Sequence, residues 1–266
     1  IGMYPYLVAD GHGRTLVASS AGVADSEGRQ LWRLKREGFT RLVPLMRAGQ
    51  GEPTFFSYQN MDRIDRHDLS GKVIWSVNLR AANVGTYRTK DGDQLPFAVV
   101  GHGQSSELKL YDIDGQPKTQ IALPEWAGSV ESIDWPSRGF LLVGRGSWLG
   151  VLDSSGKEVF KHVIQGTSFR PYHGPDGVPV RFDGGKEPYL AVMSHGSSGY
   201  ARSVLLVFDP RGTLVWQEEL NKLRAMVAVP RADTNAEVLL VGGMDGVIEY
   251  SLDPSAPNTQ FEKDAA

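Results

Sequence analysis

The sequence predicts an all-β fold, a β-propeller of six four-stranded antiparallel blades. Three observations predict it: one short motif recurs about every 43 residues, strand-like segments follow one another at short intervals, and no long helical period is present. Six repeats of that length account for nearly all of the 266 residues. Radial repetition of small sheets is one of the few ways in which an all-β chain protects its sheet edges.

The repeated motif is Asp-x-x-Gly followed, after three further positions, by an aromatic residue. The copy at Asp112 has Thr119 in the aromatic position, and the copy at Asp253 has lost its Gly. The intervals between successive Asp residues are 43, 44, 41, 56 and 44 residues. The four complete copies pair Asp25 with Trp32, Asp68 with Trp75, Asp153 with Phe160, and Asp209 with Trp216.

The chemistry of this motif is that of a β-hairpin turn. An Asp side chain can accept a hydrogen bond from the backbone two residues further on, and Gly can adopt the positive φ that a tight turn needs. Strand-like residues flank the turns, as at 108–111 and 204–208 before them and at 72–75 and 213–216 after them. We expect the aromatic residue to pack between neighbouring repeats.

Two further strands are predicted upstream of each turn. One follows a polar, Gly- or Asp-rich turn and is nearly continuously apolar, as a buried strand would be; the other precedes it, as at 41–46, 130–134 and 225–229. We therefore expect one domain, 1–266, with blades at about 1–36, 37–80, 81–124, 125–165, 166–221 and 222–266. Each repeat holds its four strands in order, so no strand exchange between the termini would close the ring. A ring of seven or eight blades with a part upstream of Ile1 is the alternative.

These motifs resemble known repeats. The Asp-x-x-Gly-x-x-x-Trp motif resembles the repeats of quinoprotein-like propellers, including the outer-membrane-assembly lipoprotein family. The Asp- and Gly-rich turn before an apolar strand resembles FG-GAP repeats. The resemblance implies a bacterial, periplasmic or otherwise extracytoplasmic protein. Quinoprotein dehydrogenases have more blades and often an adjacent Cys pair, whereas this chain has no Cys, so a quinone-dependent enzyme is not expected.

Composition excludes several classes of function. The formal net charge of −3 offers no basic surface for non-specific nucleic-acid binding. No apolar run approaches the ~18 residues that a membrane-spanning helix needs. Without Cys there is no disulfide, thiolate metal site or Cys nucleophile. The chain begins without a charged and then apolar leader, which suggests a processed protein or an excised piece.

No cofactor is expected. A Ca²⁺ site in an FG-GAP loop needs six to eight oxygen ligands, usually from a series of Asp residues. The nearest approach here is Asp91-Gly92-Asp93, which offers two carboxylates and then Gln94. Ca²⁺ at Asp91 and Asp93 stays as a weak alternative.

One set of polar residues falls at the same place in successive repeats, just past the apolar strand. In a propeller, equivalent positions form a ring at one mouth of the central channel. Arg can donate a bidentate pair of hydrogen bonds to an anion, and His gains charge at mildly acidic pH. The equivalent residues are Ser20, Gln59, His102, Arg145, His195 and Gly243, and we expect Gln59, His102, Arg145 and His195 to bind a ligand.

The leading hypothesis is therefore a non-catalytic binding or scaffold propeller for a protein partner or a polar or anionic ligand. The rival is a propeller hydrolase or lyase with its active site at the same channel mouth. Two His residues without a third ligand make a poor zinc site, and no Gly-x-Ser-x-Gly motif is present. We name no catalytic residue.

The longest interval between motifs holds an insertion. Extra loops of repeat proteins often mediate binding, and Tyr and Arg are enriched at interface hot spots. Tyr172, Tyr200 and Arg202 are the predicted partner contacts.

Overall fold

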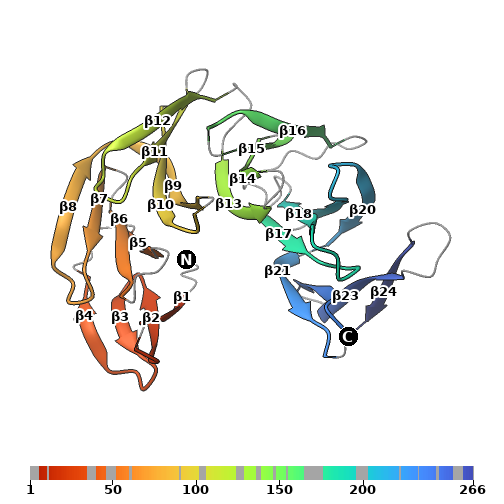
Figure 1. Ribbon diagram of the computed structural model, residues 1–266, viewed down its shortest axis with the longest axis horizontal. Coiled ribbons are helices and arrows are strands. Elements are labelled where there is room, and N and C mark those ends of the chain that lie inside the picture. Colours follow the sequence, from red (N-terminus) through yellow and green to blue (C-terminus); the bar gives the residue numbers. More distant parts are fainter. Residues whose placement is uncertain are drawn as a thin grey trace. The chain divides into compact units, whose positions relative to one another are not determined.

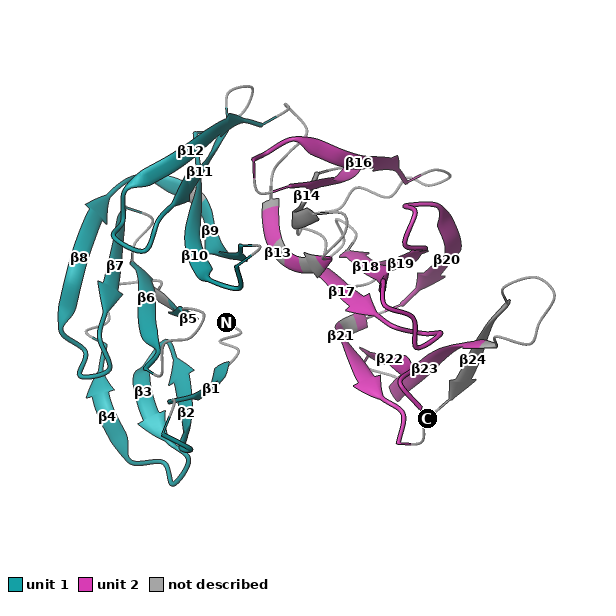
Figure 2. Ribbon diagram, in the orientation of Figure 1, with its two compact units in different colours: residues 1–125 teal, residues 126–266 magenta. Residues whose placement is uncertain are grey.

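The computed structural model consists of two compact units, residues 1–125 and 126–266 (Figure 2). It describes residues 6–10, 12–34, 40–45, 52–59, 62–89, 91–101, 106–123, 129–135, 139–145, 148–153, 155–164, 176–195, 203–221, 223–232, 234–243, 246–253 and 260–265. Within these ranges the residues form strands and turns, as the sequence predicted.

The described strands form six sheets, each made of four consecutive strands. Unit 1 contains β1 (Tyr6–Ala9), β2 (Thr15–Ser19), β3 (Gly22–Asp25), β4 (Gln30–Arg33), β5 (Thr40–Leu45), β6 (Thr54–Gln59), β7 (Arg63–His67), β8 (Val73–Asn78), β9 (Ala81–Arg88), β10 (Gln94–Val100), β11 (Glu107–Tyr111) and β12 (Pro117–Ala122). Unit 2 contains β13 (Ser129–Trp135), β14 (Gly139–Arg145), β15 (Trp148–Leu152), β16 (Glu158–Val163), β17 (Asp176–Val180), β18 (Tyr189–His195), β19 (Ser203–Phe208), β20 (Leu214–Leu220), β21 (Leu223–Pro230), β22 (Glu237–Gly243), β23 (Gly246–Asp253) and β24 (Gln260–Ala265).

Every sheet is an antiparallel meander in which each strand pairs with the next one along the chain. The first strands of neighbouring sheets approach one another: β1, β5 and β9 in unit 1, and β13, β17 and β21 in unit 2 (Figure 1). Second and third strands are the most buried, and β19 is buried at all six positions. Fourth strands form a sheet edge and alternate between exposed and half-buried positions, as in β8 and β12.

The Asp-x-x-Gly motif forms the predicted turn between the third and fourth strands. At Asp68, Oδ1 accepts hydrogen bonds from the backbone N–H groups of Ser70 (2.9 Å) and Lys72 (3.0 Å). The Gly71 N–H donates to the Asp68 carbonyl at 3.0 Å, and Gly71 has a φ of 85°. Turns of the same kind begin at Asp25, Asp112, Asp153 and Asp209.

A further copy of this turn joins β1 to β2, where the sequence predicted only a polar, Gly- or Asp-rich turn. Asp10 Oδ1 accepts from the backbone N–H groups of His12 (2.8 Å) and Arg14 (2.9 Å). Gly13 has a φ of 86°. The spacing Asp10-x-x-Gly13 was the available signal; it is the same as in the other turns.

The aromatic residue of the motif packs on the turn Gly of the next sheet, which confirms packing between repeats. A Cβ added to Gly71 would lie 2.7 Å from the Trp32 ring, and one added to Gly115 would lie 2.8 Å from Trp75. In unit 2 a Cβ on Gly212 would lie 3.1 Å from Phe160. Trp75 Nε1 also donates to a carbonyl of the next turn, that of Ile113, at 2.8 Å. In these three copies the motif therefore closes its own hairpin and packs on the next sheet of the same unit.

The hydrophobic core lies between the sheets of each unit. In unit 1, Leu16 and Phe55 belong to one cluster of buried residues, and Phe56 and Ala98 belong to another. In unit 2, Trp135 is fully buried, and its Nε1 donates to the Pro188 carbonyl at 2.8 Å. Burial of these side chains supplies the main stabilisation of each unit.

Candidate functional site

The predicted ligand-binding residues share one backbone position. Gln59, Arg145 and His195 are the last residues of β6, β14 and β18, which are the second strands of their sheets. Gly243 also ends a second strand, β22, and Ser20 follows β2 directly. We call these positions the second-strand ends. The description of Gln59, Arg145 and His195 extends to the backbone alone.

The four predicted residues fall into both units. Arg145 and His195 lie in neighbouring sheets of unit 2, whose first strands β13 and β17 contact each other. Gln59 lies in unit 1, on the second of its three sheets. His102 lies outside the described residues, two positions beyond the end of β10 at Val100. The predicted partner contacts also lie outside them: Tyr172, Tyr200 and Arg202.

A guanidinium group that the repeat pattern did not predict lies beside one second-strand end. Arg63 begins β7 and is the register partner of Gln59. Its Nε donates to Asp65 Oδ1 at 2.7 Å, and half of its side chain is exposed. The carboxylate of Asp65 is buried, so it holds this Arg at the end of the hairpin. The alternation of polar and apolar residues over Arg63, Ile64 and Asp65 was the sequence signal for this placement.

Unit 1 contains a Ser–His pair, and its surroundings define what it can do. Ser57 Oγ lies 2.8 Å from His67 Nε2, and His67 Nδ1 lies 3.3 Å from the Gly71 carbonyl oxygen. The His67 ring stacks on Trp32 with the centroids 5.2 Å apart. Ser57 is fully buried and His67 is 4% exposed. A nucleophile must reach its substrate, so this buried pair is a packing contact within one sheet and not a catalytic dyad. Stacking of the His67 ring on Trp32 joins that sheet to the preceding one.

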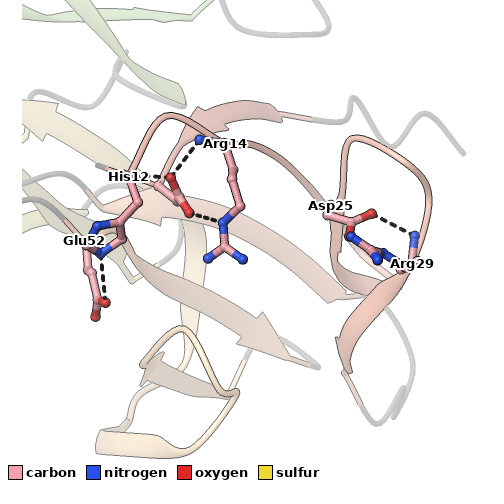
Figure 3. A network of polar contacts seen from close by, with 6 residues as sticks. His12, Arg14, Asp25, Arg29 and Glu52 are labelled. Atoms are coloured by element: carbon pink, nitrogen blue, oxygen red, sulfur yellow. Dashed lines mark hydrogen bonds and ion pairs between the residues drawn. The ribbon is translucent and has the colours of Figure 1, made fainter.

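Charged residues gather at the turn between β1 and β2 and at the turn between β3 and β4 (Figure 3). The buried carboxylate of Asp10 accepts a hydrogen bond from Arg14 Nε, and that of Asp25 accepts one from Arg29 Nε at 2.7 Å. Burial alone would raise the pKa of Asp10, but hydrogen bonds from Arg14 and from the backbone outweigh it and lower the pKa to about 2. These carboxylates close their own turns.

A contact between His12 and Glu52 links the turns of two neighbouring sheets in unit 1. His12 Nε2, in the turn between β1 and β2, lies 3.4 Å from Glu52 Oε1, in the turn before β6 (Figure 3). Both side chains are more than half exposed, at 62% and 63%. Exposed pairs of this kind contribute little to stability.

The weak Ca²⁺ alternative falls in the turn between β9 and β10. Thr89 takes the place of the turn Asp there: its Oγ1 accepts from the Asp93 N–H at 3.2 Å, and its carbonyl accepts from Gly92 at 3.0 Å. Asp91 is exposed. Among the described residues, no three His, Cys, Asp or Glu side chains come together as a possible metal site.

Comparison with known proteins identifies the fold. No protein-family model matches the chain, and no curated protein matches it. Several solved structures are similar. The Dos1 propeller is 13% identical, with 99% of this chain and 71% of that chain covered and a TM-score of 0.62. BBS1N in complex with ARL6DN is 12% identical, with 96% and 80% covered and a TM-score of 0.63.

A third similar structure is that of BamB from Moraxella catarrhalis. It is 14% identical, with 95% of this chain and 73% of that chain covered and a TM-score of 0.53. Identities this low establish the fold and not the activity. The protein is an all-β propeller with four-stranded antiparallel blades. Within its described ranges, no helix is long and apolar enough to cross a membrane.

Proposed function

We propose that this propeller is a non-catalytic binding or scaffold protein, which recognises a protein partner or a polar or anionic ligand at the second-strand ends. One observation carries the proposal: Gln59, Arg145 and His195 each terminate the second strand of a different sheet. The three residues thus occupy the same backbone position in their sheets. His102, just past the second strand of a further sheet, completes the set.

The chemistry of these residues favours an anionic group. Arg145 offers a planar set of donors for a carboxylate or phosphate, and His102 and His195 add positive charge at mildly acidic pH. A protein partner would meet the same donors with Asp, Glu or main-chain carbonyl groups. BBS1N, one of the similar propellers, was solved in complex with ARL6DN, which is in line with binding as the use of such a fold.

The proposal includes a single six-bladed ring over residues 1–266, in which each four-stranded sheet is one blade. A ring of seven or eight blades is the alternative. The aromatic-on-Gly packing between sheets favours repeats of the quinoprotein-like type. The resemblance to BamB supports an extracytoplasmic, bacterial protein. Tyr172, Tyr200 and Arg202 are proposed as contacts with the partner.

Binding of inorganic phosphate and of a Glu-rich peptide tests this function. Each is titrated into the protein in a calorimeter, once at mildly acidic and once at mildly alkaline pH. We expect tighter binding at the acidic pH, since protonation of His adds positive charge there. The double variant Arg145→Ala with His195→Ala should weaken binding about tenfold or more. Its matched control is Arg211→Ala with His12→Ala, two residues that are exposed on turns outside the second-strand ends.

Two results would contradict the proposal: absence of binding to both probes, or an equal loss in the control variant. The double variant His102→Ala with His195→Ala distinguishes the enzyme hypothesis from the scaffold hypothesis. An enzyme at this place would lose turnover and keep most of its binding, whereas a scaffold has no turnover to lose.

A further inference from the structure

The fourth strands form the free edges of the sheets, and β8 differs from the others in its sequence. An exposed edge strand offers unpaired N–H and C=O groups to any other extended chain, and proteins commonly protect such edges with charged residues or Pro. Five of the six fourth strands follow that rule. They carry Arg33 in β4, Pro117 and Lys118 in β12, Glu158 and Lys161 in β16, Glu218 and Glu219 in β20, and Glu262, Lys263 and Asp264 in β24.

β8 has the sequence Val-Ile-Trp-Ser-Val-Asn, which contains neither charge nor Pro. Val73 and Ile74 are two of the large apolar side chains that the described part of the protein exposes, at 40% and 49%. Among the described residues β8 pairs with β7 alone, and it runs along the outside of unit 1 (Figure 2). Its apolar, uncharged edge is therefore accessible.

The register shows which backbone groups face outward. The N–H of Leu79 donates to the Asp62 carbonyl at 2.8 Å, so this residue faces β7. Along an antiparallel pair, residues alternate between facing the partner strand and facing away from it. Val77 therefore faces β7 as Leu79 does, and Ser76 and Asn78 direct their N–H and C=O groups to the free edge. Ile74 is the extra residue of a bulge between Val73 and Trp75, so the regular edge begins after it.

Charges at the two ends of the strands indicate what kind of chain would fit. Asp68 and Asp62 flank β7, and each lies across from the end of β8. Lys72 and Arg80 flank β8, and both are exposed. The residues that flank the ends of β7 and β8 thus carry opposite charges, and opposite charges on neighbouring strands are favourable whereas like charges are not. A second copy of β8 paired antiparallel would place Lys72 near Arg80 at both ends, so self-association is disfavoured.

We propose that the free edge of β8 is an interaction surface that binds an extended segment of a partner protein by strand addition, with acidic residues at both ends of that segment. Main-chain hydrogen bonds to Ser76 and Asn78 give the binding, as in other cases of strand addition. Carboxylates meet Lys72 and Arg80. This surface lies on a fourth strand and is distinct from the second-strand ends. The two proposals can therefore be tested independently, and failure of one does not contradict the other.

A synthetic peptide of about nine residues tests the proposal, because that length spans the edge from Lys72 to Arg80. It alternates Val and Thr between terminal Glu residues, and a comparison peptide has Lys in place of Glu. We expect the Glu-ended peptide to bind about tenfold more tightly than the Lys-ended one. In an NMR titration the amide signals of Ser76 and Asn78 should shift most.

Two pairs of variants separate this surface from unspecific effects. Asn78→Pro removes an outward N–H and leaves the β7 ladder intact; it should abolish binding, whereas Asn78→Ala should retain it. Lys72→Glu should weaken binding of the Glu-ended peptide several-fold, and it tests the surface even if Asn78→Pro fails to fold. Its control, Lys157→Glu, changes the same position of the turn at Asp153.

The proposal is wrong if Asn78→Pro binds as wild type does, or if Lys72→Glu and Lys157→Glu weaken binding equally. Analytical ultracentrifugation of the protein without peptide tests whether a second copy of the chain occupies the β8 edge instead. A dimer that Asn78→Pro abolishes would show that β8 pairs with a second copy.

Discussion

His67 is the residue whose burial has the clearest consequence for stability. It is 4% exposed and stacks on Trp32 from the preceding sheet. Burial, the main cause, lowers the pKa of His67, although its contact with the Gly71 carbonyl and the charges of Asp65 and Asp68 act in the opposite direction. The neutral ring fits the site, since one nitrogen can donate to Gly71 while the other accepts from Ser57.

We predict that the free energy of unfolding falls as the pH drops below about 6.5, the ordinary pKa of His. The unfolded chain binds a proton there more readily than the folded protein does, so the stability present above that pH is lost on acidification. One such His contributes a slope of at most about 1.4 kcal/mol per pH unit. His162, whose pKa burial also lowers, adds to it in the same direction.

Urea denaturation between pH 7 and pH 5 measures this slope. His67→Gln keeps a donor and an acceptor without a titrating group, so its slope should be shallower than that of the wild type. Equal slopes would show that His67 does not carry the pH dependence.

The element that organises the fold is the Asp-x-x-Gly turn with its aromatic residue. Its Asp and Gly close a hairpin through hydrogen bonds that span at most four residues. Its aromatic residue, on the fourth strand, lies against the turn Gly of the next sheet. A bulge immediately before Trp32, Trp75, Phe160 and Trp216 is shared by the fourth strands β4, β8, β16 and β20.

The two functions of the turn Gly can be separated by substitution. Gly71 and Gly28 occupy the same turn position with φ values of 85° and 82°. A Cβ on Gly71 would lie 2.7 Å from Trp32, whereas one on Gly28 would meet no atom within 4 Å. Gly28→Ala should cost about 1–2 kcal/mol for the positive φ alone, and Gly71→Ala about 1–3 kcal/mol more for overpacking.

The free energy of unfolding of both variants, measured by chemical denaturation, gives the difference. A cost at Gly28 as large as that at Gly71 would mean that the aromatic contact does not limit the size of the residue in this turn.

At the scale of the whole molecule, the six sheets repeat one plan of four consecutive antiparallel strands. In the described strands, burial is highest in inner strands such as β19, whereas fourth strands such as β8 and β12 are exposed or half-buried. The Asp-x-x-Gly turns that the structure describes are closed by side chains and backbone of the chain itself. The turn at Asp91 and Asp93 is closed in the same way, with Thr89 in the Asp position.

We therefore predict that Ca²⁺ does not stabilise the protein. Two carboxylates fall short of the six to eight oxygens that Ca²⁺ prefers. The thermal midpoint should be the same with millimolar Ca²⁺ and with a chelator, because a ligand that binds the folded state raises it. The prediction is wrong if Ca²⁺ raises the thermal midpoint of the wild type and does not raise that of Asp91→Ala. That result would support a Ca²⁺ site at this turn.

Periodicity in the sequence was enough to predict the strands, the hairpin turns and the aromatic packing between repeats. These features depend on hydrogen bonds within a few residues and on apolar positions that recur with the repeat. The local sequence therefore encodes them. It also predicted that Gln59, Arg145 and His195 occupy equivalent places, and their role in binding stays a prediction. The buried contact of Ser57 with His67, the placement of Arg63 beside Gln59 and the free edge of β8 required the fold. The first two contacts depend on the register of β6 and β7, which makes Gln59 and Arg63 partners and places Ser57 diagonally across from His67. The third depends on the order of strands in the sheet. Both are set by burial in the assembled sheets.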